Sequence, residues 1–193
     1  MATGYVRPAR PGEAAEIARI QLSTWRTAYR RLIPKSVLDG LDESLMAEQW
    51  AEAIASPPTP RHRVLIAVEQ ADVDHTVGFV ASGPADDAAL APDEKPLPDG
   101  VAAITELLVE PRWGRRGHGS RLLSAAVAMW RGDGFDTAVA WAYEQDPATR
   151  KFLVSAGWAP DGEVRSLDVD DLLVVQLRLH VALEEQGREA SDA

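Results

Sequence analysis

The chain has no cysteine among its 193 residues. This absence excludes disulfides, thiolate metal ligands and a cysteine nucleophile. A long hydrophobic run is also missing, because no stretch approaches the ~20 apolar residues of a membrane span, and the N-terminus has no apolar core of a secretion signal. We therefore expect a cytoplasmic protein with no membrane partner.

Positive charge is scarce: 20 Lys and Arg stand against 30 Asp and Glu, for a formal net charge of −10. Such a balance argues against a nucleic-acid partner, which usually requires a basic face. A negative field suits a cationic small molecule, although the same charge could serve solubility alone. The four histidines have no ligand spacing, so we expect no metal site; they are His62, His75, His118 and His180.

The length fits one domain, which we place at residues 1–183, with a frayed tail at 184–193. Residues 84–100 contain four prolines, five acids and one lysine. Because this composition can bury little, we expect a mobile acidic surface loop there.

Hydrophobic periodicity and turn residues predict a mixed α/β sheet. Helices are expected at 13–33, 44–56, 120–131 and 147–156, and strands at 5–7, 63–69, 76–81, 102–109, 137–141 and 172–179. The sequence leaves open whether one or two strands follow the last helix.

The segment between the strand at 102–109 and the helix at 120–131 is rich in glycine and arginine. It holds Gly114, Gly117 and Gly119, together with Arg112, Arg115, Arg116 and Arg121, and no acid from 111 to 121. Glycines allow a backbone to approach a ligand closely, and a helix N-terminus attracts anions. The segment therefore predicts a phosphate site, with a tight corner as the alternative. Dinucleotide and nucleoside-triphosphate loop motifs are both absent.

Glu106 interrupts the apolar strand and, by alternation, should share a face with Ile104 and Leu108. A carboxylate at such a position is costly unless it is paired or used. It is our candidate general base, against a salt bridge or an edge position in water. Trp25 and Tyr29 lie one helical turn apart, either as core packing or as an aromatic wall for an acceptor.

Residues 102–158 resemble the core of the GNAT superfamily of acetyl-CoA-dependent N-acetyltransferases. The family's Val-x-Pro and Gly-x-Gly elements match Val109, Pro111, Gly117 and Gly119, and its later Asn-x-x-Ala-x-x-Phe-Tyr-x-x-x-Gly-Phe element resembles the stretch 146–158. The N-terminal Trp25-Arg26-Thr27-Ala28-Tyr29 stretch is similar to one bacterial branch.

The resemblance implies a mostly antiparallel sheet with splayed central strands and about four flanking helices. It implies acetyl-CoA as co-substrate, with the pyrophosphate held around residues 115–120 and pantetheine paired with the strand at 107–109. The cofactor residues it suggests are Leu107, Leu108, Val109, Arg115, Arg116, Gly117, His118, Gly119, Ser120, Asp146 and Arg150.

Three residues depart from the family pattern. Gly114 stands where Arg or Gln is usual, Asp146 replaces an Asn, and Leu153 replaces the Tyr that often protonates the leaving thiolate. Water, Tyr29 or Tyr143 would have to replace that proton donor.

We expect acetyl transfer to a primary amine by direct attack. A small cationic acceptor is favoured by the acidic loop, and a peptide amine is the close alternative. Leu153 and Asp146 keep open a non-catalytic acyl-CoA sensor. A homodimer through the late strands is also suggested by the resemblance.

Overall fold

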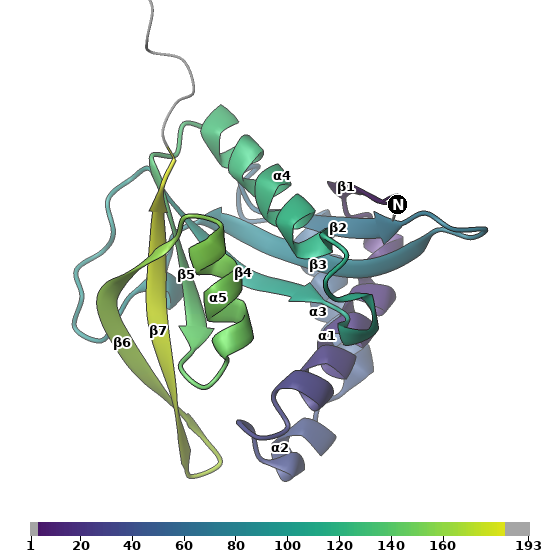
Figure 1. Cartoon of the computed structure of the whole chain (residues 1–193), viewed down its shortest axis with the longest axis horizontal. Coiled ribbons are helices and arrows are strands. Elements are labelled where there is room, and N and C mark those ends of the chain that lie inside the picture. Colours follow the sequence, from purple (N-terminus) through teal and green to yellow (C-terminus); the bar gives the residue numbers. More distant parts are fainter. Residues whose placement is uncertain (1–3, 184–193) are drawn as a thin grey trace, which may run out of the picture.

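The computed structural model describes residues 4–183, so the predicted tail at 184–193 lies outside the described part (Figure 1). The strands are β1 (Gly4–Pro8), β2 (Arg63–Glu69), β3 (His75–Pro84), β4 (Val101–Val109), β5 (Thr137–Tyr143), β6 (Ala159–Val169) and β7 (Leu172–Ala182). The helices are α1 (Ala14–Ala28), α2 (Lys35–Asp39), α3 (Glu43–Ala55), α4 (His118–Gly132) and α5 (Pro147–Ser155), with short 3-10 turns at Pro11–Glu13, Asp87–Ala89 and Pro111–Trp113.

The seven strands form one sheet in the order β1-β2-β3-β4-β5-β7-β6. Every pair is antiparallel except β4 with β5, which confirms the predicted mixed, mostly antiparallel sheet. The described residues form five α-helices rather than about four, because the short α2 follows Pro34. None of these helices is long and apolar enough to span a membrane.

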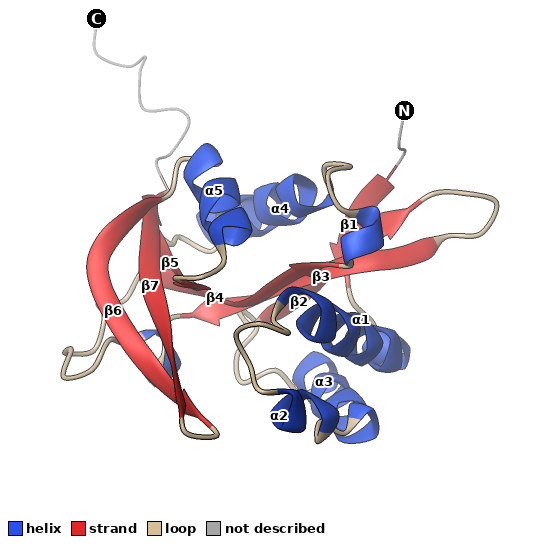
Figure 2. Cartoon of the chain, turned by 60° about the horizontal axis from the view of Figure 1, so that its bottom comes forward, coloured by secondary structure: helices blue, strands red, loops and turns tan. Residues whose placement is uncertain are grey.

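Helices cover both faces of the sheet, α4 and α5 on one and α1, α2 and α3 on the other (Figure 2). Alternation along β2 explains the two layers: Leu65 packs in the cluster that contains α4, whereas Ile66 packs with Ile17 and Ile20 of α1. The core is therefore split by the sheet into two apolar layers.

The two central strands separate halfway along their length. β4 and β5 are paired only from Val101 with Thr137 to Ile104 with Ala140. Beyond this point β4 stays with β3 as far as Val109, while β5 stays with β7 as far as Tyr143. The predicted splay is thus present, and it leaves one edge of β4 unpaired.

A bulge lies where the splay begins. On β3, Ala81 pairs with Glu106 and the next residue, Ser82, pairs with Ile104, so Thr105 is the extra residue on β4. A bulge bends its strand and resets the alternation of side chains. The expectation that Glu106 and Ile104 share a face is consequently wrong: Ile104 packs with the α4 layer, whereas Leu108 packs with the α1 layer.

The helix bounds differ from the predicted ones by more than one residue at two places. The first helix ends at Ala28 rather than near Pro34, because Tyr29 leaves helical geometry and buries its side chain to 8% exposure. The helix after the glycine–arginine loop, α4, begins at His118 instead of residue 120. Two strands follow α5, and the one that periodicity left open is β6.

The acidic segment 84–100 is attached to the sheet. Ala89 and Ala91 are buried, and buried Arg178 of β7 donates to Glu94 at 2.6 and 2.7 Å and to the Ala89 carbonyl at 3.0 Å. The expectation that this segment buries little is wrong at these residues, whereas its mobility stays a prediction.

Candidate active site

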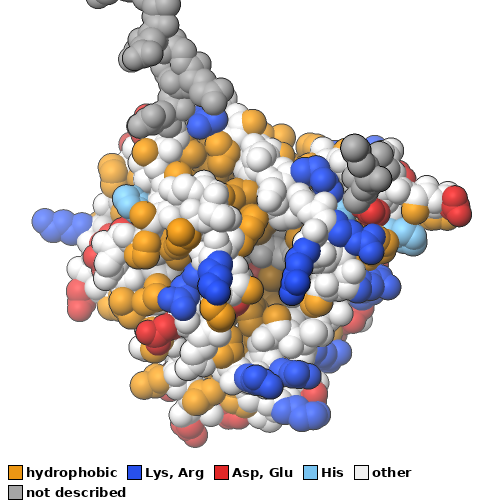
Figure 3. All heavy atoms as spheres, viewed as in Figure 1, with side chains coloured by type: hydrophobic (Ala, Val, Ile, Leu, Met, Phe, Trp, Pro, Cys, Tyr) orange, Lys and Arg blue, Asp and Glu red, His pale blue; other side chains and the backbone are white. Residues whose placement is uncertain are grey.

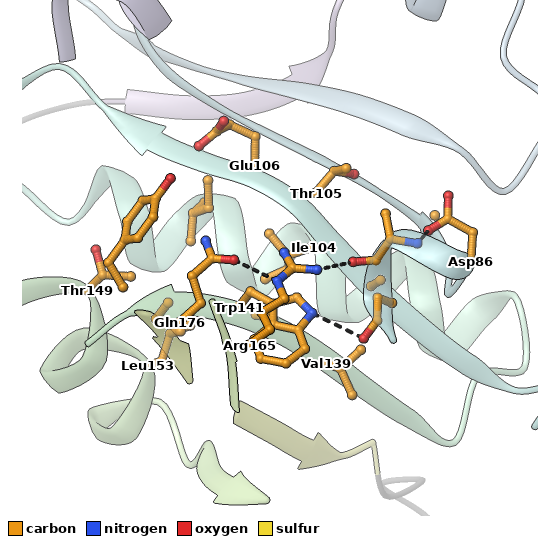
Figure 4. A pocket seen from close by; sticks show the side chains of 18 of the residues that line it. Asp86, Ile104, Thr105, Glu106, Val139, Trp141, Thr149, Leu153, Arg165 and Gln176 are labelled. Carbon is orange, nitrogen blue, oxygen red and sulfur yellow. Dashed lines mark hydrogen bonds between the residues drawn. The ribbon is translucent and has the colours of Figure 1, made fainter. Parts of the chain in front are cut away.

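A cavity of about 320 Å³ lies in the splay. Trp25 of α1 and Tyr29 just after it line the cavity from one face of the sheet, and Thr149 and Leu153 of α5 line it from the other. The unpaired stretch of β4 crosses it (Figure 4). The cavity therefore reaches through the sheet between the two helical layers.

Glu106 lies in this cavity and faces α1. Its Oε2 accepts a hydrogen bond from Gln21 Nε2 at 3.2 Å, and Gln21 Oε1 accepts one from Trp50 Nε1 at 2.7 Å. Burial raises the pKa of Glu106 to about 7, although contacts with Gln21 and Trp25 act in the opposite direction. No arginine or lysine among the described residues forms an ion pair with it, so the salt-bridge alternative is not observed.

The aromatic residues beside Glu106 pack against other side chains and also line the cavity. Trp25 packs against the α1 layer, and the rings of Tyr29 and Tyr143 meet edge to face with centroids 4.9 Å apart. All three line the cavity. Burial, with the nearby charge of Glu106, raises the pKa of both tyrosines, so their hydroxyls stay protonated.

The loop before α4 has the geometry of an anion seat. Gly117 is the N-cap of α4 with φ of +80°, and no side chain caps this end. The first helical bond runs from Arg121 N–H to the Gly117 carbonyl, which leaves the amides of residues 118–120 without intrahelical acceptors. Basic side chains stand over this loop and over α5, on either side of a hollow (Figure 3).

The loop arginines differ in how far they are paired. Arg112 lies 3.0 Å from Glu110, and Arg116 lies 3.6 Å from Glu69 and stacks over Trp113 at 4.9 Å. Arg115, which is exposed and has φ of +60°, forms no ion pair with the described residues. Arg115 is therefore the loop cation most available to an anion.

The His118 side chain does not face the loop, which corrects its predicted role. It is 1% exposed, with Nδ1 3.0 Å from Arg121 Nη2 and Nε2 3.0 Å from Glu69 Oε2. A guanidinium can only donate, so Nδ1 accepts and Nε2 carries the proton. Burial, followed by the charge of Arg121, lowers the pKa of His118. Only its backbone amide is free to meet a ligand.

Asp146 and Arg150 lie on or beside α5. Asp146 Oδ1 accepts from the amides of Ala148 and Thr149, and its Oδ2 accepts from the Thr149 hydroxyl at 2.6 Å. This carboxylate caps the helix, so the predicted cofactor role for its side chain is not supported. Arg150 is half-buried, and its Nε has no partner among the described residues.

Leu153 is 2% exposed and offers the cavity only an apolar surface. The α5 hydroxyl that lines the cavity is that of Thr149, one turn earlier, and it donates to Asp146.

Sequence reasoning missed several residues of the site. Gln21, which donates to Glu106, precedes Trp25 by one helical turn and could have been found as part of the same face. Arg165 of β6, Trp141 of β5 and Gln176 of β7 line the cavity and were missed as well. Arg165 gave no usable signal, because its strand was left open.

Among the described residues no group of three or more potential ligands gathers to hold a metal ion. The site is therefore described by its cavity, by Glu106 with its raised pKa and by its anion seat.

The sequence matches the Acetyltransferase (GNAT) family over residues 21–158. YuaI of Bacillus subtilis, named an uncharacterized N-acetyltransferase, is 27% identical over 143 residues, or 74% of this chain and 73% of YuaI.

Solved structures share the fold. The structure of yncA from Salmonella typhimurium, determined with its cofactor acetyl-CoA, has a TM-score of 0.66 at 16% identity and covers 100% of this chain and 99% of its own. The paia N-acetyltransferase of Thermoplasma acidophilum, in complex with coenzyme A, has a TM-score of 0.63 at 12% identity and covers 91% and 98%. With the family match spanning well over half of its length, the chain belongs to the GNAT family of acetyltransferases.

Proposed function

We propose that this acetyltransferase moves the acetyl group of acetyl-CoA directly to a primary amine, with Glu106 as the general base. The observation that carries the proposal is the half-buried Glu106 carboxylate, whose pKa is raised to about 7 and which lines a cavity bounded by both helical layers. A base is most effective when its pKa lies near the working pH.

In the proposed step the amine nitrogen bonds to the acetyl carbon while the carbon–sulfur bond breaks. The amine gives its proton to the Glu106 carboxylate, and the sulfur leaves as a thiolate. Tyr29 and Tyr143 have raised pKa values, which makes them poor acids, and Leu153 has no proton to give. We therefore assign protonation of the thiolate to water.

The unpaired edge of β4 supports the place of the pantetheine arm. Glu110 N–H donates to the Val77 carbonyl, so by antiparallel alternation Leu108 also bonds to β3. The polar backbone groups of Leu107 and Val109 then point into the splay. These two residues, rather than Leu108, would pair with the arm, and an amide there would meet the developing oxyanion.

The anion seat supports the place of the pyrophosphate. We assign it to the amides of residues 118–120, with Arg115 and Arg116 as the charged partners. Gly117 and Gly119 let the backbone approach the phosphates closely. Phe152 of α5 lies next to Gly119 at the start of α4, and Arg150 is on the same helix as Phe152.

The acceptor is proposed to be a small amine, since a cavity of about 320 Å³ fits a small molecule better than a peptide chain. The predicted homodimer stays a prediction. Val164 on β6, the outer strand of the sheet, is exposed, and so are Leu172 and Leu173 at the start of β7.

The test is release of free CoA from acetyl-CoA by the purified full chain with a panel of amino acids, polyamines, aminoglycosides and peptides. We expect turnover on at least one small amine and strong loss in Glu106→Gln. Saturable CoA binding without turnover on any acceptor, or turnover unchanged in Glu106→Gln, would favour the acyl-CoA sensor or another base.

A further inference from the structure

Arg165 brings a positive charge into the cavity that holds Glu106. It lies on β6 opposite Gln176 of β7, and its side chain is half-buried. Its Nε donates to Gln176 Oε1 at 2.7 Å, its Nη1 donates to the Ala88 carbonyl at 2.6 Å, and its guanidinium stacks over Trp141 at 4.2 Å (Figure 4). Three uncharged groups therefore hold the guanidinium in place.

No carboxylate neutralises this charge. Among residues 4–183, Arg165 forms no ion pair within 4.0 Å. Asp86, which also lines the cavity, uses Oδ1 to accept from the Ala88 amide. Burial lowers the pKa of Arg165 and the charge of Arg178 adds to this, whereas the Tyr143 hydroxyl acts in the opposite direction and no carboxylate contributes.

Arg178 provides an internal comparison. It lies on the adjacent strand β7 and approaches the same Trp141 ring, at 5.6 Å. Unlike Arg165, it is paired with two acids, Glu94 and Asp161. The chain thus neutralises the arginine outside the cavity lining and leaves the one inside it without a counter-ion.

An unpaired cation that is partly removed from water is costly, and a guanidinium has five N–H donors in a planar fork. Two of the five donors of Arg165 are used, on Gln176 and Ala88. The remaining donors can take a bidentate carboxylate. Arg165 lines a cavity whose lining includes none of the loop residues 115–120, so we do not assign it to the phosphates of CoA.

We infer that the acceptor is a small amine that also carries a carboxylate, as an amino acid does, and that Arg165 binds this carboxylate while the amine faces Glu106. This inference rests on the proposed function and narrows its acceptor. It replaces the cationic acceptor suggested by the acidic segment, in which Glu94 is already paired with Arg178 and Asp86 already caps a turn.

The test compares matched amines at saturating acetyl-CoA: free amino acids, the same amino acids as carboxamides, and polyamines. We expect kcat/KM for free acids to exceed that for their carboxamides by at least about tenfold, as for loss of a charged hydrogen-bonded pair. In Arg165→Gln the ratio of kcat/KM for the free acid to kcat/KM for its carboxamide should fall toward one. The main cause should be a higher KM for the acid, and the KM for acetyl-CoA should stay unchanged.

Arg131→Gln removes an exposed arginine at the end of α4 and is the control for loss of charge. Arg165→Lys keeps the charge without the fork and should retain part of the preference. If Arg165→Gln does not fold, the ratio of kcat/KM for acids to kcat/KM for carboxamides in the wild-type chain still tests the inference, because a ratio near one would overturn it.

The outcomes separate the two proposals. Turnover with equal rates on acids and carboxamides, or a preference for polyamines or peptides, would overturn the carboxylate inference and leave the amine acetyltransferase standing. A wild-type preference that survives Arg165→Gln would also overturn it. Absence of CoA release with every amine would count against the proposed function itself.

Discussion

The orientation of the Gln21 amide follows from its two neighbours. An indole N–H can only donate, so the Trp50 contact requires the Gln21 oxygen to face Trp50. The amide nitrogen then faces Glu106, where it donates at 3.2 Å. A donor favours the carboxylate form, whereas burial favours the neutral acid, and the pKa of about 7 is the balance of the two.

The first prediction concerns the pH dependence of catalysis. Because Glu106 accepts a proton only as a carboxylate, kcat/KM should rise with pH through about 7 and then level. Glu106→Gln should lower it by about 10²- to 10⁴-fold, the typical contribution of a general base. Steady-state rates from pH 5.5 to 9 measure both effects.

Gln21→Leu is the companion variant. Without the donor, the carboxylate loses stabilisation, so the rising limb should shift to higher pH by on the order of one unit. If the rising limb of the kcat/KM pH profile does not move in Gln21→Leu, a group other than Glu106 determines its midpoint.

The second prediction concerns stability. The folded-state pKa of Glu106 is raised above its ordinary value of 4.5, so its favourable contribution is complete below 4.5 and is lost as pH rises through about 7. Glu106→Gln should therefore increase the free energy of unfolding at pH 8 by about 1–3 kcal/mol and change it little at pH 5. Denaturant unfolding at both pH values measures this; a destabilised variant at pH 8 would contradict it.

The third prediction concerns His118, whose pKa is lowered by burial and by Arg121. Its unfolded form takes up a proton first as pH falls, so the fold loses stability below about pH 6.5. His118→Gln, which cannot be protonated there, should show a shallower loss between pH 6.5 and 5. If the free energy of unfolding falls equally steeply with pH in the wild-type chain and in His118→Gln, protonation of His118 does not cause the loss of stability.

At the scale of elements, the loop and the start of α4 act as one unit. The fourth prediction is that replacing both Arg115 and Arg116 by alanine weakens CoA binding by about 2–4 kcal/mol, the value of lost charge-assisted hydrogen bonds. Calorimetry measures the dissociation constant. Arg131→Ala, at the opposite end of the same helix, should leave it unchanged, and an unchanged constant in the double variant would place the phosphates elsewhere.

Sequence patterns predicted the elements whose apolar residues repeat clearly. The central strands, α4 and the glycine–arginine loop are found because their patterns are local. β6 was left open because it is an edge strand whose side chains are largely exposed, so it lacks a continuous apolar face. Arg165 was missed for the same reason.

Other features depend on contacts that no local pattern contains. The extra residue Thr105 is defined only by its pairing with β3, yet it decides that Glu106 faces α1 and Ile104 does not. The burial of His118 depends on Glu69, which lies 49 residues earlier in the chain. The glycines and arginines of the loop predicted a phosphate site there, but tertiary contacts decide which of its side chains are unpaired and which are buried.

At the scale of the whole molecule, the cavity has walls from both helical layers, with α5 on one face of the sheet and α1 on the other (Figure 2). The thioester and the amine can then enter the cavity from opposite faces of the sheet, so that neither reactant blocks the other. Both reactants would be present together at the moment of transfer, so the fifth prediction is intersecting double-reciprocal lines when both concentrations are varied. Parallel lines would require an acetylated protein, and spent coenzyme would then have to depart before the amine could react.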